Sequence, residues 1–249
     1  MTEALRLSGQ TALVTGAARR IGATIVRTLH AAGAQVMIHH HRSREQALQL
    51  AAQLNAVRGH SAAAVSADLC DSAQLPQLVR QTCERFGSLS LLVNNASTFY
   101  PTPLGHISLE QWQDLMGINL QAPLFLSQAA APALRSNRGA IINIVDIHGQ
   151  RPLREHAVYS TAKAGLIMLT RSLARELAPE VRVNAIAPGP VLWPEAGIDE
   201  QRKSKILEQT PLQRAGSPQD IAQAVLFFVE APFVTGQILA VDGGRSLGW

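Results

Sequence analysis

The side chains best suited to proton chemistry are those of Tyr159 and Lys163, which lie four residues apart in a segment with a helical pattern. In a helix such a pair shares one face, with a rise of only about 6 Å between the two residues. A phenol, with an ordinary pKa of about 10, exchanges protons poorly at neutral pH, but a fixed ammonium nearby favours the phenolate and lowers that pKa. The spacing therefore predicts that Tyr159 is a general acid and base beside Lys163.

A second group of residues lies in the turn TGAARRIG, residues 15–22, between a short aliphatic run and a helical pattern. Gly16 and Gly22 permit a tight turn and a close approach of the backbone, and Arg20 and Ile21 stand just before the second glycine. The N–H groups and the dipole at the start of a helix favour a pyrophosphate. A glycine pair with this spacing also occurs in ordinary strand–helix turns. The residues of the next strand are therefore needed to distinguish a phosphate-binding turn from an ordinary one.

The second predicted strand ends in the sequence HHHRS, residues 39–43, which contains no acidic side chain. NAD-binding domains usually place an Asp or Glu there to hold the adenosine ribose. Arg42 can instead pair with a 2′-phosphate, and Ser43 at a helix start can donate a hydrogen bond to the same group. The sequence therefore predicts NADPH or NADP+ as the cofactor.

The sequence predicts no metal site. Consecutive strand residues point to opposite faces, so the three adjacent histidines cannot converge on one ion. Cys70 and Cys83 show neither metal-ligand nor redox spacing, and we interpret them as ordinary thiols.

Small or polar residues also follow the third and fourth predicted strands. Asp68, with Leu69, is placed to meet the adenine, although Asp68 could also be the N-cap of the next helix. Asn95, Ala96 and Ser97 are expected to flank the dinucleotide.

These groups need a framework that brings the ends of several strands together. β-Branched and aliphatic runs predict strands at Thr11–Thr15, Gln35–Ile38, Ala62–Ala67, Leu89–Val93, Ala140–Val145, Val181–Ala187 and Gln237–Val241. Amphipathic patterns predict helices at Ile21–Ala32, Ser43–Val57, Ser72–Phe86, Leu109–Leu134, Val158–Leu177 and Pro218–Val229. The alternation indicates an α/β fold with a Rossmann-like, doubly wound parallel sheet flanked by helices, which binds ligands outside the carboxyl ends of its strands.

Length and composition fit a single domain over residues 1–249. The chain is 47% hydrophobic and 16% charged, and no apolar run approaches the roughly 18 residues that cross a bilayer, so we expect no membrane contact. Met1–Gly9 is short and polar, and we expect no signal peptide and a cytoplasmic location. The net charge of +4 comes from scattered residues, which favours a small anionic ligand over nucleic acid.

The least regular stretch is Pro188–Thr210, and residues 190–212 are a candidate substrate lid. It contains Leu192-Trp193-Pro194, an apolar segment that could close over a bound heterocycle and exclude water. Trp193 could equally be an interface residue.

Further motifs join these groups, namely Asn94-Asn95-Ala96, Asn119, Pro188-Gly189 and the terminal Val241-Asp242-Gly243-Gly244. With the glycine turn and the Tyr159/Lys163 pair, they resemble the short-chain dehydrogenase/reductase family over residues 7–247. The resemblance implies that Lys163 also binds the nicotinamide ribose and that Asn119 holds a proton-relaying water. It implies cofactor contacts from Tyr159, Pro188 and Gly189, and a homotetramer formed through the helices at 109–134 and 158–177 and strand contacts near the C-terminus.

Three residues depart from the usual pattern of that family. Arg20 stands where most members have a second glycine, Asp146 stands where they have a catalytic serine, and Val191 replaces a hydroxyl side chain. A carboxyl group does little for a ketone oxygen that gains negative charge, but it can orient a water or supply a proton to a ring nitrogen during reduction of a C=N bond. The substrate is therefore expected to be an imine-like heterocycle.

The chain is most similar in these features to the pteridine reductases, which share the Asp, the run from Asn95 to Pro103 and the phosphate-binding His41-Arg42-Ser43. The resemblance implies NADPH-dependent reduction of a dihydropterin, and of oxidised pterin as a further substrate, with Phe99 stacked on the ring. Phe99 could instead be a core aromatic. The implied catalytic residues are Asp146, Tyr159, Lys163 and Asn119, and the implied substrate contacts are Arg20, Ser97, Phe99, Asp146, Tyr159 and Trp193. The alternatives are a carbonyl reductase, such as a 3-oxoacyl thioester reductase, and a non-catalytic NADPH-binding sensor.

Overall fold

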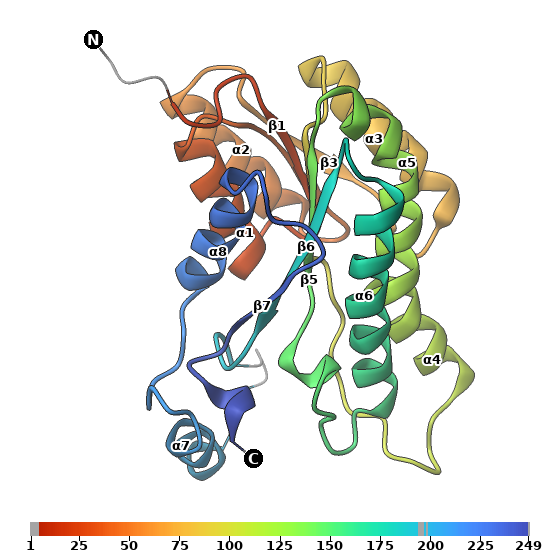
Figure 1. Cartoon of the computed structure of the whole chain (residues 1–249), viewed down its shortest axis with the longest axis vertical. Coiled ribbons are helices and arrows are strands. Elements are labelled where there is room, and N and C mark those ends of the chain that lie inside the picture. The colour runs from red at the N-terminus through yellow and green to blue at the C-terminus, as the bar shows by residue number, and fades with distance from the viewer. Residues whose placement is uncertain (1–4, 194–196, 198, 249) are drawn as a thin grey trace.

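The buried aliphatic runs of the chain pair into one parallel sheet in a computed structural model that describes residues 5–193, 197 and 199–248 (Figure 1). Within these residues the sheet has seven strands in the order β3-β2-β1-β4-β5-β6-β7. The strands are β1 (Thr11–Val14), β2 (Gln35–His40), β3 (Ala62–Ser66), β4 (Leu91–Asn94), β5 (Ala140–Ile144), β6 (Arg182–Pro188) and β7 (Ile238–Val241). The predicted fold class is confirmed.

Helices connect successive strands and cover both faces of the sheet. The α-helices are α1 (Arg20–Ala31), α2 (Arg44–Val57), α3 (Leu75–Phe86), α4 (Leu109–Met116), α5 (Ala122–Ser136), α6 (Ala157–Glu176), α7 (Glu200–Glu208) and α8 (Pro218–Glu230). Short turns of helix lie at η1 (Ser72–Gln74), η2 (Gly117–Gln121), η3 (Ile147–Gly149) and η4 (Arg245–Leu247).

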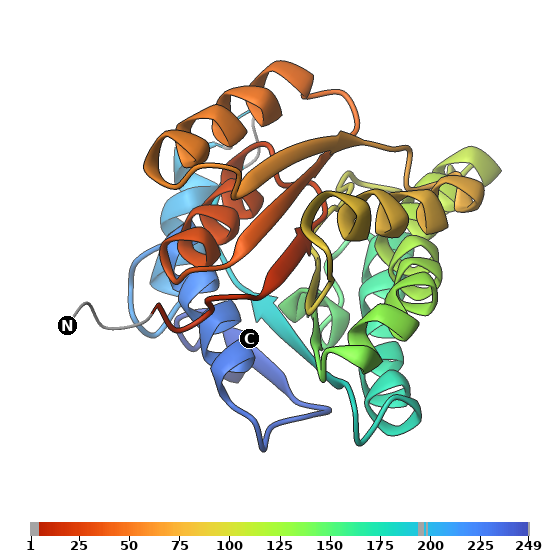
Figure 2. The ribbon, with the colours of Figure 1, turned by 90° about the horizontal axis from the view of Figure 1, so that it is seen from above.

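The strands alternate their side chains between two apolar layers. Ala12 and Val14 of β1 pack with α1, α2 and α8 on one face, whereas Leu13 packs with α3, α5 and α6 on the other. Figure 2 shows the two helical layers on opposite sides of the twisted sheet. A strand buried on both faces reads as a continuous apolar run, which is why these strands were visible in the sequence.

The predicted single helix Leu109–Leu134 is wrong. It is divided into α4 and α5 by η2, a π-helical turn at Gly117–Gln121. A π turn inserts an extra residue and so rotates the side chains that follow it, and such turns are frequent at functional sites. Here the turn contains Asn119.

The stretch that we interpreted as irregular contains helix α7, which begins after the N-cap Asp199, whose side chain accepts a hydrogen bond from the backbone N–H of Arg202. Of the lid predicted at residues 190–212, positions 194–196 and 198 lie outside the described residues. The described residues of the predicted lid include a short apolar segment, residues 190–193, and helix α7.

The order of the strands reverses at β1, since β2 lies on one side of it and β4 on the other. The loops that follow β1 and β4 consequently leave the sheet toward opposite faces and open a crevice between them.

Among the helices of the described residues, none combines the length and the apolar character that a membrane span requires.

Candidate active site

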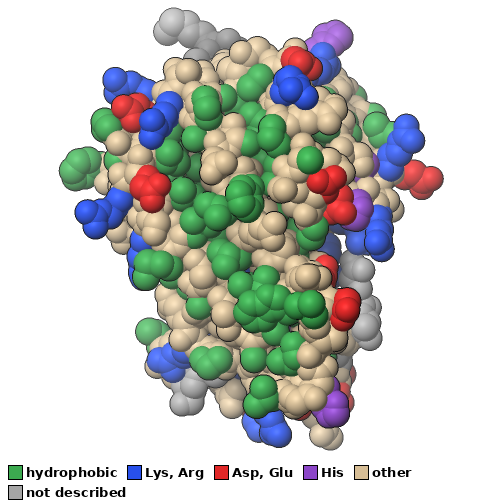
Figure 3. Space-filling view, turned by 90° about the vertical axis from the view of Figure 1, so that its right-hand side faces the viewer, with side chains coloured by type: hydrophobic (Ala, Val, Ile, Leu, Met, Phe, Trp, Pro, Cys, Tyr) green, Lys and Arg blue, Asp and Glu red, His purple; other side chains and the backbone are tan. Residues whose placement is uncertain are grey.

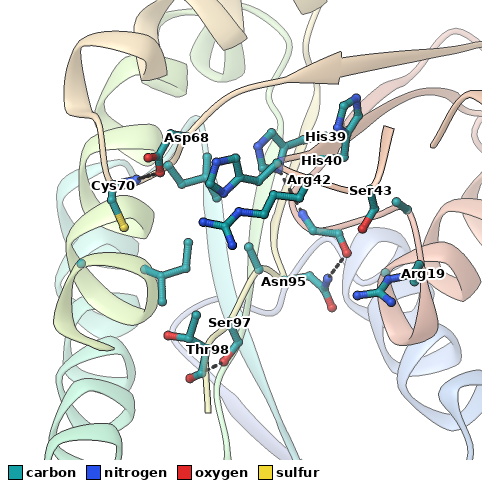
Figure 4. A pocket seen from close by; sticks show the side chains of 18 of the residues that line it. Arg19, His39, His40, Arg42, Ser43, Asp68, Cys70, Asn95, Ser97 and Thr98 are labelled. Atoms are coloured by element: carbon teal, nitrogen blue, oxygen red, sulfur yellow. Dashed lines mark hydrogen bonds between the residues drawn. The ribbon is translucent and has the colours of Figure 1, made fainter. Parts of the chain in front are cut away.

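A cavity of about 950 Å³ lies at the carboxyl ends of β1, β2, β3 and β4. Most of the predicted cofactor-binding residues line it, namely Gly16, Arg20, Ile21, Gly22, His41, Arg42, Ser43, Asp68, Leu69, Asn95, Ala96 and Ser97. Side chains that the sequence reasoning left out also line it, among them Arg19, His39, His40, Cys70 and Thr98 (Figure 4). Arg19 could have been found as a second cation in the glycine turn.

The turn between β1 and α1 has a shape that only small residues fit. Gly16 has a φ of +59°, and a Cβ there would lie 2.9 Å from the Cα of Ala96. A Cβ on Gly22 would lie 2.4 Å from the carbonyl oxygen of Gly16. The loop after β4 closes on this turn, because the Asn95 side-chain amide donates to the carbonyls of Thr15 and Gly16 at 2.8 and 3.1 Å. A backbone cradle at a helix N-terminus fits a pyrophosphate.

Arg20 occupies the left-handed region, with a φ of 53°, where glycine is the favoured residue. Its guanidinium donates to the carbonyl oxygen of Trp193 at 3.0 Å. The phosphate turn is thus tied to the segment that precedes α7. A strained non-glycine residue at a ligand site indicates a side chain with a function.

The far end of the cavity carries the cationic and hydroxyl groups expected for a 2′-phosphate. Ser43 is the N-cap of α2, yet its hydroxyl makes no capping hydrogen bond. Arg42 extends into the middle of the cavity, and Arg19 lies in its wall on the side of Ser43 in the view of Figure 4. This set of donors fits a phosphorylated ribose better than bare ribose hydroxyls.

The role of Asp68 as the N-cap of the following helix is corrected by the structure. Its Oδ1 accepts from the backbone N–H of Cys70, and Asp71 caps η1 instead by accepting from Ala73. The cap lies three residues further on because the chain makes an additional turn before α3 begins. Asp68 remains in the wall of the cavity.

Helix α6 places Tyr159 and Lys163 on one face, and both side chains are buried. The Tyr159 hydroxyl donates to the Asp146 Oδ2 at 2.8 Å. The Lys163 ammonium donates to the carbonyl oxygen of Ile144, at the end of β5, at 3.0 Å, and lies 5.7 Å from the centroid of the Tyr159 ring. The phenol therefore contacts the carboxylate directly, whereas the ammonium lies beneath the ring.

The predicted lowering of the Tyr159 pKa is wrong for the arrangement in this structure. Burial raises the pKa of Tyr159 well above its ordinary value, and the charge and hydrogen bond of Asp146 raise it further. Burial also lowers the pKa of Lys163 to about 8. The reason is that removal from water disfavours both charged forms, and the nearest charge to the phenol is negative.

Asn119 is fully buried in the π turn, and all of its side-chain groups are engaged. Its Oδ1 accepts from the Ser97 hydroxyl at 2.6 Å. Its Nδ2 donates to the carbonyls of Thr98 and Leu115, each at 3.0 Å. Asn119 thus joins the loop after β4 to the junction of α4 and α5.

Phe99 is not a core aromatic, since 46% of it is exposed. Its ring stacks on that of His156, with centroids 4.7 Å apart and an interplanar angle of 19°. The same ring meets Tyr159 edge-on at 4.8 Å. A partly exposed aromatic ring therefore adjoins the Tyr159–Asp146 pair.

The end of β6 and the residues that follow it make contacts of three different kinds. Pro188 ends β6, and a Cβ on Gly189 would lie 2.6 Å from the Cβ of Asp242. Trp193 is half-buried, with the Lys203 ammonium 5.8 Å above its ring. The 950 Å³ cavity is not lined by Pro188, Gly189, Trp193, Phe99, Asn119, Asp146, Tyr159 or Lys163. Within the described part of the chain, no group of three or more His, Cys, Asp or Glu side chains could hold a metal ion.

Residues 16–246 match the profile of the enoyl-(acyl carrier protein) reductase family. The chain is 37% identical to pteridine reductase 1 of Leishmania tarentolae over 95% of this chain and 96% of that one. It is 35% identical to the 3-oxoacyl-[acyl-carrier-protein] reductase of Synechocystis sp. over 97% and 98%. Its fold superposes on a crystal structure of a blue fluorescent protein from a metagenomic library in complex with NADPH, with a TM-score of 0.91, 36% identity and coverage of 96% and 99%.

Proposed function

Because the chain belongs to the short-chain dehydrogenase/reductase family and is an NADPH-dependent oxidoreductase, we propose that it reduces a dihydropterin to the tetrahydro form. The observation that carries the proposal is the hydrogen bond from Tyr159 to Asp146 at 2.8 Å. It sets a carboxylate, rather than a hydroxyl, beside the proposed proton donor Tyr159, which supports a substrate that takes up a proton on nitrogen. Oxidised pterin is a further proposed substrate.

Most of the residues that would hold NADPH line the cavity. The turn at Gly16–Gly22 accepts the pyrophosphate, and Arg42 with Ser43 and His41 accepts the 2′-phosphate. Asp68 and Leu69 meet the adenine, and Asn95, Ala96 and Ser97 flank the dinucleotide. Lys163 and Tyr159 would meet the nicotinamide ribose, with Pro188 and Gly189 beside the ring.

When bound, the nicotinamide supplies the hydride that adds to the carbon of a C=N bond. The nitrogen of that bond then needs a proton. Tyr159 holds one, because its pKa is raised, and Asp146 lies at hydrogen-bond distance to pass on a proton or to orient a water. Asn119 supports the relay as a positioning residue through its hydrogen bonds to Ser97 and the neighbouring backbone.

The substrate ring is held by flat and cationic groups on either side of this pair. The partly exposed ring of Phe99 suits aromatic contact with a bicyclic ring, and Arg20 and Ser97 can bind the polar edge of that ring. Trp193 would cover the substrate ring, and residues 190–212, which include Trp193, would act as a lid. The Arg20 bond to Trp193 supports this arrangement, because it joins the cofactor turn to the covering segment.

The second candidate function is reduction of a carbonyl group, as in a 3-oxoacyl thioester. It is favoured by the 35% identity to the Synechocystis 3-oxoacyl-[acyl-carrier-protein] reductase, which is close to the 37% identity to the pteridine reductase. The hydrogen bond between Tyr159 and Asp146 argues against carbonyl reduction. A carboxylate at this position would repel the negative charge that develops on a carbonyl oxygen. A third candidate, a non-catalytic NADPH sensor, would bind NADPH without oxidising it.

The deciding experiment follows NADPH oxidation with dihydrobiopterin, dihydromonapterin, dihydrofolate and an acetoacetyl thioester side by side, with Tyr159→Phe as the blank. Turnover of a dihydropterin that is abolished in the blank supports the proposal and ranks the pterin side chains. Turnover of the thioester alone shows a carbonyl reductase. Tight NADPH binding with no turnover of any substrate shows a sensor.

We also propose that the protein is a homotetramer that assembles in part through the α4–α6 face, which we define by the exposed side chains of Leu109, Trp112, Phe125 and Met168. Figure 3 shows apolar side chains gathered over the middle of this side of the molecule. Such a patch marks an interaction surface. A cytoplasmic location stays a prediction that cell fractionation tests.

A further inference from the structure

His39 is a buried polar residue in the wall of the cavity that neither proton transfer nor direct phosphate binding uses. Only 2% of it is exposed, and it lies at the end of β2 on the same face as Met37. Its Nδ1 accepts from the backbone N–H of Gly16 at 3.1 Å, and its Nε2 lies 3.1 Å from the carbonyl oxygen of Ala67 (Figure 4). Both ring nitrogens are therefore engaged by backbone groups of different loops.

These partners define a single form of the imidazole. An N–H of Gly16 requires a lone pair on Nδ1, so the proton is on Nε2, which donates to Ala67. Burial lowers the pKa of His39 to about 4, so the ring is neutral under physiological conditions. Protonation would place two N–H groups face to face and break the bond to Gly16.

The bond to Gly16 holds the cofactor turn in its left-handed shape. On one side the turn abuts Ala96, and on the other the backbone N–H of Ala17 donates to the carbonyl oxygen of His39 at 2.9 Å. Because the Gly16 N–H donates to His39, the position of the residues that follow it, which lead into α1, depends on this bond. His39 thereby decides how the turn presents itself to a phosphate.

The bond to Ala67 holds the other side of the same cavity. Ala67 directly precedes Asp68 and Leu69, which line the cavity beyond β3. Strands β1 and β3 are not neighbours, since β2 lies between them. A side chain at the end of β2 is therefore well placed to join the loops that follow the two strands.

We propose that His39 is a positioning residue for NADPH, which sets the Gly16 turn through Nδ1 and the Asp68 loop through Nε2. The proposal depends on the proposed function only in taking NADPH as the ligand, and it is independent of which substrate is reduced. It predicts that a variant keeps its affinity for NADPH only if it keeps a hydrogen-bond acceptor at the position of Nδ1.

Three variants separate the two bonds. In His39→Asn the Oδ1 lies near the former Nδ1 and can accept from Gly16, in His39→Gln the amide reaches instead toward the former Nε2, and His39→Leu can do neither. NADPH affinity, measured by fluorescence titration without substrate, is expected to fall about tenfold or more in His39→Leu, because a buried N–H loses its partner. His39→Asn is expected to stay within about threefold of the parent, and His39→Gln to resemble His39→Leu.

The matched control is Met37→Ala, which removes a buried apolar side chain from the same face of β2 but leaves both hydrogen bonds of His39 in place. It is expected to lower the free energy of unfolding but to leave NADPH affinity unchanged. The KM for NADPH should rise in His39→Leu while kcat at saturating NADPH is preserved.

Equal affinity of the Asn and Gln variants, parental affinity of His39→Leu, or an equal loss in Met37→Ala would overturn the proposal. If His39→Leu does not fold, the comparison of the Asn and Gln variants decides it. Absence of pterin turnover with the predicted order of NADPH affinities would refute the proposed substrate and leave the role of His39 intact.

Discussion

Asp146 and Tyr159 form the contact on which the chemistry of the site depends. The carboxylate accepts from the phenol and also from the backbone N–H of His148, so it is held as the N-cap of η3. A carboxylate anchored in this way is a fixed negative charge beside the proton donor. It keeps the phenol protonated, so that a proton is held at Tyr159 for transfer to a ring nitrogen, although the raised pKa also makes the phenol a weaker acid.

Replacement of Asp146 by Ser is expected to lower dihydropterin turnover by about tenfold or more while sparing any ketone reduction. It also removes the charge and the carboxylate hydrogen bond that raise the pKa of Tyr159. Since the phenol is active when protonated, activity at high pH should be lost at a lower pH in the variant than in the parent. Pterin turnover that survives unchanged, with the same pH profile of kcat/KM, would refute the role of Asp146.

Lys163 illustrates a functional residue that opposes stability. Its folded-state pKa of about 8 lies below the unfolded value of about 10.5, so the unfolded chain binds more protons between these values. Lys163 therefore costs no free energy of unfolding above pH 10.5, where it is neutral in both states. The cost grows as the pH falls toward the folded pKa of about 8, and at pH 7 it is nearly complete.

Lys163→Met is therefore expected to raise the free energy of unfolding of the protein without cofactor at pH 7 by about 1–3 kcal/mol, because the desolvation cost of the buried ammonium exceeds what its hydrogen bond to Ile144 and the charge of Asp146 return. The gain should shrink as the pH rises toward 10. Activity should be abolished. Chemical denaturation across this pH range measures the effect, and a variant less stable than the parent at pH 7 contradicts it.

At the scale of elements, the site depends on how closely η3 approaches α6. A Cβ on Gly149 would lie 2.9 Å from the backbone carbonyl carbon of Lys163, which cannot move without α6. A Cβ on Gly165 would lie 2.7 Å from Leu120, but there the contact is the flexible end of a side chain. The two glycines thus permit close packing for different reasons.

Gly149→Ala is expected to push η3, and with it Asp146, away from Tyr159, and to lower stability by about 1–3 kcal/mol. Its kcat should fall together with stability. Gly165→Ala is the matched control, since rotation of Leu120 can absorb the new methyl group. If both variants keep the parental kcat, the spacing of η3 and α6 does not control the site.

The elements also show where sequence patterns failed. The helical periodicity from Leu109 to Leu134 is nearly continuous, and a π turn that adds one residue hardly disturbs it. Helix α7 was missed because it has no buried residue and hence no apolar stripe to recognise. Both differences lie beside the site, where local regularity gives way to the geometry that a ligand needs.

At the scale of the molecule, the proposed tetramer makes a prediction about the α4–α6 face. Phe125 and Met168 are 38% and 58% exposed, on α5 and α6 respectively. Phe125→Glu with Met168→Glu should place charges in an apolar interface and reduce the molar mass in light scattering from that of a tetramer to that of a dimer or monomer. Lys203→Glu on α7, outside this face, is the control, and an unchanged mass in the double variant would refute the assignment.

The α/β class, the parallel sheet and most of the cavity wall follow from the amino-acid sequence alone. Continuous apolar runs require burial on both faces, and parallel strands carry their following loops to one edge of the sheet. For that reason residues as distant as Gly16, Arg42 and Asn95 could be predicted to meet around one cavity.

The electrostatics of the site and the contacts that support it depend on the three-dimensional arrangement. The spacing of Tyr159 and Lys163 suggested a lowered phenol pKa, but burial and the proximity of Asp146 raise it. The role of His39 was likewise hidden, because its partners at Gly16 and Ala67 belong to loops that follow two other strands. Desolvation and hydrogen bonding depend on which groups lie nearest in three dimensions, and residue spacing along the chain does not contain that information.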